Sequence, residues 1–120
     1  MNIDITAKKF DLTPSIKEYV ETRVGGMSRF YDKVTEARVI LEVDDGHHQH
    51  GDINKCEILL RVPGHNDIVA KEWTDDMHKS INKTAGEAER ELKKAKDKTL
   101  RRDDRELRRL KEEGFSAKED

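Results

Sequence analysis

The chain has 120 residues and a formal net charge of −2, and 42% of its residues are charged whereas only 33% are hydrophobic. This length provides one small domain with a modest core. The charged fraction lies far above the globular average of about 25%, so part of the chain lacks the apolar residues for a core. A single cysteine, Cys56, excludes an internal disulfide, and no apolar run is long enough to span a membrane. We therefore expect a cytoplasmic protein that does not bind membranes.

The first part of the chain predicts a strand followed by a helix. Residues 2–6 alternate between apolar and polar side chains, a pattern typical of a strand with one buried face. Thr13 fits a helix N-cap, and Pro14 fits the first helical position, where its missing N–H is not needed. Apolar residues then recur at helical spacing over residues 16–30. The glycine pair at positions 25 and 26 weakens this helix by roughly 1 kcal/mol per residue relative to alanine and predicts a bend or a close approach of another segment.

Three strands are predicted next, each with apolar residues alternating on one face. They cover residues 36–43, 53–62 and 67–71. Pro63-Gly64-His65-Asn66 lies between the last two and is a strong signal for a hairpin turn. The last two strands should therefore pair in an antiparallel manner.

A long helix is predicted from Thr74 or Asp75 to about Lys111, and its two sides differ in chemistry. At about 100° per residue, one arc is apolar and contains Met77, Ile81, Ala85, Ala88, Leu92 and Ala95. The arc nearly opposite is cationic and contains Lys79, Lys83, Arg90, Lys94, Arg101, Arg105 and Arg108. Because the apolar arc must face a core, the cationic arc faces outward. A row of cations on a rigid helix is suited to a phosphate backbone.

The charges are segregated along the chain, which the net value conceals. Residues 1–89 hold 12 lysines and arginines against 17 acidic residues, whereas residues 90–111 hold 11 against five. Beyond Leu100 the apolar arc is lost, because acidic residues replace it. We therefore expect a domain over residues 1–100 and a charged extension over residues 101–120 that projects as a helix or is disordered.

The order of elements is strand, helix, three strands, helix, and it predicts an α+β fold. A four-stranded, mostly antiparallel sheet with both helices on one face would bury both apolar helix faces at once. The first two strands should be parallel neighbours, because a helix connects them.

Other chemistry is weakly indicated. His47, His48 and His50 crowd the loop before the third strand, where a metal site is the alternative to a polar loop; we expect the polar loop, because metal ligands normally come from separated segments. Trp73 could stack on a base, although its position favours packing. The sequence has no glycine-rich phosphate loop, no nucleophile elbow, and no histidine or cysteine set at a spacing that suggests a triad. We therefore expect no enzyme, no cofactor, no metal and no small-molecule substrate.

Four segments resemble the hibernation promoting factor and ribosome-associated inhibitor A family, also called sigma modulation proteins. They are residues 1–6 (MNIDIT), 12–16 (LTPSI), 75–82 (DDMHKSIN) and 90–98 (RELKKAKDK). The resemblance covers about residues 1–100 and is most specific in the last two segments. It is to the short form, because the long form adds a C-terminal dimerisation domain for which we expect no room here.

The resemblance implies a protein that binds the small ribosomal subunit during stress. Family members lie between the head and body of that subunit, contact its RNA through basic helix residues, and occupy the space of messenger RNA and transfer RNA. Carried over by position, the candidate RNA-binding residues are Arg23, Lys79, Lys83, Arg90, Lys94 and Lys98, and the basic run that follows adds Lys93 and Arg101. The free protein is expected to be a monomer.

Three departures from the family pattern bear on this interface. His78 stands where tyrosine is usual, Glu87 stands where lysine is common, and Gly25-Gly26 replaces a segment that often carries a lysine. Each weakens the expected RNA face or moves it toward residues 93–109. Two alternatives stay open: a domain that binds double-stranded RNA off the ribosome, and a regulatory protein whose basic helix docks on an acidic protein.

Overall fold

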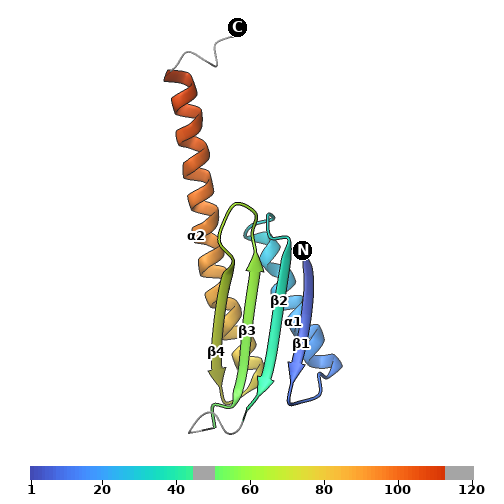
Figure 1. Ribbon diagram of the computed structural model, residues 1–120. Coiled ribbons are helices and arrows are strands. Elements are labelled where there is room, and N and C mark those ends of the chain that lie inside the picture. The colour runs from blue at the N-terminus through green and yellow to red at the C-terminus, as the bar shows by residue number, and fades with distance from the viewer. Residues whose placement is uncertain (45–50, 113–120) are drawn as a thin grey trace.

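A computed structural model describes residues 1–44 and 51–112, and shows a four-stranded sheet with both helices on one face (Figure 1). The strands are β1 (Asn2–Lys8), β2 (Glu36–Val43), β3 (Asn54–Arg61) and β4 (Ile68–Thr74). The helices are α1 (Pro14–Gly25), the short 3-10 helix η1 (Gly26–Arg29) and α2 (Met77–Glu112). The predicted α+β fold and its β-α-β-β-β-α order are confirmed.

The four strands follow one another across the sheet in the order β1-β2-β3-β4. β1 and β2 are parallel, as predicted for strands joined through a helix, and the other two pairs are antiparallel. In register, Val39 of β2 lies opposite Ile58 of β3, which lies opposite Ala70 of β4. All three side chains are buried, so this row marks the sheet face that the helices cover.

The first helix begins where the sequence predicts. The Thr13 side-chain oxygen accepts a hydrogen bond from the backbone N–H of Ile16 at 3.2 Å, and Pro14 opens the helix. The α-helix ends at Gly25, and the chain continues as the 3-10 helix η1. The interruption predicted at the glycine pair is therefore a change of helix type.

Three predicted boundaries are wrong by more than one residue. β1 extends to Lys8 rather than Thr6, β4 ends at Thr74 rather than Lys71, and α2 begins at Met77 rather than at Thr74 or Asp75. The strand β4 continues through Thr74 because this residue remains paired with Asn54 of β3. The helix then starts behind Asp76, whose carboxylate accepts a hydrogen bond from the backbone N–H of Lys79 at 3.0 Å.

The inner face of α2 packs against β3 and β4 and forms much of the core. Five of the six residues on the predicted apolar arc are buried, namely Met77, Ile81, Ala85, Ala88 and Leu92. Ala95 is only partly buried, because the helix leaves the sheet near this point. The predicted rotational position of α2 is confirmed.

Two polar residues also lie in this interface, and the apolar pattern missed them. Ser80 and Thr84 are fully buried, and their hydroxyls donate to the β3 carbonyls of Asn54 at 2.6 Å and Cys56 at 3.1 Å. These bonds fix the position of α2 along the sheet. The Cys56 thiol is buried, as the sequence predicts, and burial raises its pKa to about 12.

Beyond the sheet, α2 continues as a single helix, which makes the molecule 65 Å long and only 27 Å by 16 Å across (Figure 1). The side chains of residues 101–109 are all exposed. The division into units 1–100 and 101–120 stays a prediction. His47, His48 and His50 lie outside the described residues. In the described part of the chain, no helix is apolar over a length that could cross a membrane.

We expect the two leucines of α2 to differ sharply in their contribution to stability. Leu92 is fully buried, so Leu92→Ala should lower the free energy of unfolding by about 2–5 kcal/mol through loss of contacts and cavity formation. Leu107 is 50% exposed, so the control Leu107→Ala should change it by less than about 0.5 kcal/mol. Urea unfolding followed by circular dichroism measures both. Equal losses would contradict the assignment of the core.

Candidate nucleic-acid interface

The outer face of α2 presents most of the predicted RNA-binding residues to solvent. Lys79, Lys83, Arg90 and Lys94 are all exposed on the side of the helix that faces away from the sheet. They lie within the first half of α2, which the buried inner face holds rigidly against β3 and β4. The helix therefore carries a row of cations whose positions are set by the core.

Several of these cations have acidic partners. Lys79 pairs with Asp75 at 3.0 Å, Lys94 pairs with Glu91 at 3.1 Å, and Lys83 reaches Glu72 of β4 at 3.2 Å. The hydrogen bond from Lys79 to Asp75 raises the pKa of this lysine. Exposed ion pairs of this kind contribute little to stability, because water screens them. A phosphate group can therefore replace the carboxylate at small cost.

Arg23 has a different environment from the other predicted residues. Its guanidinium on α1 pairs with Glu89 of α2 through two nitrogens, and its Nε donates to the side-chain oxygen of Asn82 at 3.0 Å. Only 26% of the arginine side chain is exposed. This clamp between the two helices is a structural role that the sequence pattern did not reveal, because its partners are 59 and 66 residues away.

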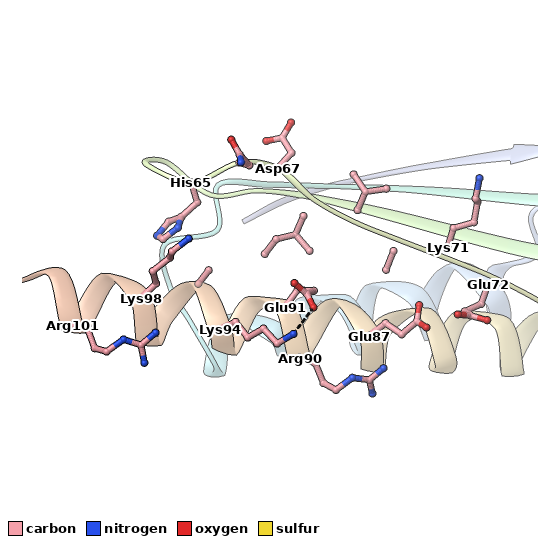
Figure 2. A pocket seen from close by; sticks show the side chains of 15 residues that line it. His65, Asp67, Lys71, Glu72, Glu87, Arg90, Glu91, Lys94, Lys98 and Arg101 are labelled. Atoms are coloured by element: carbon pink, nitrogen blue, oxygen red, sulfur yellow. Dashed lines mark hydrogen bonds and ion pairs between the residues drawn. The ribbon is translucent and has the colours of Figure 1, made fainter.

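A groove of about 1030 Å³ runs between β4 and α2 (Figure 2). Arg90, Lys94, Lys98 and Arg101 line it from the helix, whereas Lys71 of β4 lies at its edge with its side chain pointing away from α2. The groove also holds carboxylates, namely Asp67, Glu72, Glu87 and Glu91. Its potential is therefore mixed near the middle of the sheet and more positive toward Lys98 and Arg101.

Two of the carboxylates in this groove interact directly. Glu72 of β4 and Glu87 of α2 share a hydrogen bond, which lowers the pKa of Glu72 and raises that of Glu87. Burial raises the pKa of Glu87 further, whereas nearby Arg90 and Lys83 oppose the shift.

The remaining predicted cations are Lys93, Lys98 and Arg101, and of these Lys98 and Arg101 line the far end of the groove. The Lys93 ammonium sits 4.7 Å from the ring centre of Phe30 and so faces the α1 side of the helix. Lys98 and Arg101 are exposed, and no described carboxylate forms an ion pair with either of them. The same holds for Arg102, which the sequence analysis missed because it lies on the continuation of the apolar arc.

No group of described residues is arranged to hold a metal ion, counting sets of three or more histidine, cysteine or carboxylate side chains. The outer face of α2 and the groove beside it can bind a polyanion along a line of cations.

Residues 3–100 match the family described as sigma 54 modulation protein / S30EA ribosomal protein. The chain belongs to this family. The match covers the sheet, α1 and the first part of α2, so it includes the groove and all of the predicted cations except Arg101.

Relatives with assigned names share the same part of the chain. The ribosome hibernation promotion factor of Deinococcus radiodurans is 35% identical over 92 residues, which are 77% of this chain but 47% of that protein. The chain thus spans about half the length of that relative. The ribosome hibernation promoting factor of Pseudomonas putida is 29% identical over 96 residues, 80% of this chain and 87% of the relative.

A solved structure agrees with the fold. The ribosomal subunit interface protein from Coxiella burnetii superposes with a TM-score of 0.70 and covers 81% of this chain and 99% of its own. Its sequence identity of 22% supports the fold alone.

We expect Glu72→Gln to lower the pKa of Glu87. The substitution removes the negative charge of Glu72 and leaves Lys83 and Arg90 beside Glu87. The ionised form of Glu87 should therefore be favoured. Carbon-detected NMR of the side-chain carboxyl signals over a pH titration measures this change. An unchanged titration of Glu87 in the variant would show that the two carboxylates are independent.

Proposed function

We propose that this protein is a ribosome hibernation factor that inhibits translation by occupying the small ribosomal subunit. In this proposal, it binds ribosomal RNA in the channel that messenger RNA and transfer RNA use, under stress and as a monomer. The cationic outer face of α2 carries the proposal, because it holds a row of exposed positive charges on a helix fixed by the core. The names of the relatives from D. radiodurans and P. putida support the same role.

The mechanism requires no chemical step. Lysine and arginine side chains neutralise backbone phosphates and release their counterions, which supplies affinity without reading base sequence. The shape of the molecule, a narrow domain with a projecting helix, supplies placement within a structured RNA. We propose Lys79, Lys83, Arg90, Lys93, Lys94, Lys98 and Arg101 as RNA contacts. For Arg23, the ion pair with Glu89 means that an RNA contact would have to replace or extend the clamp.

We expect binding to purified small subunits to weaken steeply with salt. With about five phosphate contacts, log K should fall against log salt with a slope of roughly −3.5 to −4.5. Fluorescence anisotropy of the labelled protein at several salt concentrations gives this slope. A flat dependence would contradict binding through the RNA backbone. Tighter binding to naked RNA duplexes or to acidic proteins than to subunits would favour the two alternatives.

We expect binding to small subunits to depend on the cations of the outer face of α2 and not only on the total charge of the protein. Replacing Lys83, Arg90 and Lys94 by glutamine should abolish most binding, because these residues lie along the proposed contact. The control replaces Lys8, Arg38 and Arg61, three exposed cations on the open face of the sheet, and removes the same charge. Control binding should stay close to that of the unmodified protein. Equal losses in both variants would contradict an interface on α2.

A further inference from the structure

The point at which α2 leaves the sheet is anchored by a small polar cluster. The hydroxyl of Thr99 on α2 hydrogen-bonds to Nε2 of His65, and the hydroxyl of Tyr31 donates to the same oxygen at 3.3 Å. The rings of His65 and Tyr31 meet edge to face with their centres 6.5 Å apart. His65 lies in the turn between β3 and β4, so this cluster holds the turn against the helix.

A notch of about 500 Å³ lies beside this cluster, between the β3–β4 turn and the helix. The turn contributes Gly64, His65 and Asn66, and α2 contributes Lys98, Arg102 and Arg105. The three cations stand at positions i, i+4 and i+7, so they share one side of the helix. Figure 2 shows Lys98 extending from α2 toward His65.

The lining of this notch differs from that of the larger groove, which contains four carboxylates. No acidic residue lines it, and none of the described carboxylates forms an ion pair with Lys98, Arg102 or Arg105. Elsewhere on the same helix, Lys79, Lys94, Arg108 and Arg109 each pair with an acidic residue three or four positions away. An anion entering the notch therefore meets cations that need not first release a partner.

The notch is continuous with the larger groove between β4 and α2. His65, Asn66 and Lys98 line both spaces. The phosphates of an RNA strand can thus follow the groove and end in the notch. A small free anion would contact the notch alone, which is open to solvent. Arginine side chains suit this task because the planar guanidinium can bind two oxygens of one phosphate.

We propose that the notch formed by Lys98, Arg102, Arg105 and the β3–β4 turn binds a backbone phosphate of RNA. This proposal rests on the proposed binding to ribosomal RNA and adds a contact beyond the predicted set. Arg102 and Arg105 become RNA-binding residues, and the β3–β4 turn becomes part of the interface. The Thr99–His65–Tyr31 cluster positions the notch by holding the turn beside the helix.

The test compares two double variants of the full chain. Arg102→Gln with Arg105→Gln removes the two unpaired arginines of the notch, and Arg108→Gln with Arg109→Gln removes the same charge one turn further along. Glutamine keeps helix propensity, and circular dichroism verifies the helix in both. Binding to purified small subunits is measured over a range of salt concentrations.

The notch variant should bind roughly tenfold more weakly at low salt. Its plot of log K against log salt should be shallower by about 0.7–0.9, as expected for the loss of one phosphate contact. The control should keep the slope of the unmodified protein. Equal effects in both variants, or no effect in either, would overturn the notch while leaving the proposed function intact. If the unmodified protein shows no salt-dependent binding, the proposed function fails and the notch fails with it.

A second measurement distinguishes the source of the phosphate. Short single-stranded RNA, added to the free protein, should shift the NMR signals of the Arg102 and Arg105 side chains and of the His65 ring. Inorganic phosphate at the same phosphate concentration should shift them much less. Saturation of the notch by inorganic phosphate alone, with no additional effect of RNA, would overturn the assignment to an RNA backbone.

Discussion

The burial of one face of α2 against β3 and β4 is the interaction on which the rest of the structure depends. It joins the long helix to the sheet through apolar side chains from Met77 to Leu92, and it includes two hydroxyls bonded to carbonyls of β3. Because a helix has only one rotational position that buries this face, the opposite face is committed to solvent. The position of every cation on α2 follows from that constraint.

The acidic partners of the α2 cations are unevenly distributed along the helix, and they occur again near its end, where Arg108 pairs with Asp104 and Arg109 with Glu106. Near the sheet, cations alternate with acidic residues and several are paired, as Lys83 is with Glu72 of β4. Where the helix leaves the sheet, Lys98, Arg102 and Arg105 have no acidic partner among the described residues. A paired cation must release its carboxylate before it binds a phosphate, so part of the attraction is offset. A cation without an acidic partner has no such contact to lose. The strongest attraction for a polyanion should therefore lie where the helix leaves the sheet, around Lys98, Arg102 and Arg105.

Rigid placement of these charges depends on contacts made elsewhere. Arg23 and Glu89 tie α1 to α2, and the Thr99–His65–Tyr31 cluster ties the β3–β4 turn to α2 at the end of the sheet. Both sets of contacts join segments that are far apart in the sequence. They hold the outer face of α2 in a fixed relation to the rest of the domain, and a preorganised surface loses less conformational entropy on binding.

The sequence by itself determined the order of elements, the Thr13 cap and the two faces of α2, because capping and helical periodicity depend on residues within a few positions of one another. Only the tertiary structure decided which cations are free. Arg23 is engaged by Glu89, Lys83 by Glu72, and Arg102 is turned toward the β3–β4 turn after the sheet ends. These relations join residues on different elements, and periodicity along one helix contains no information about the charges that the fold brings beside it.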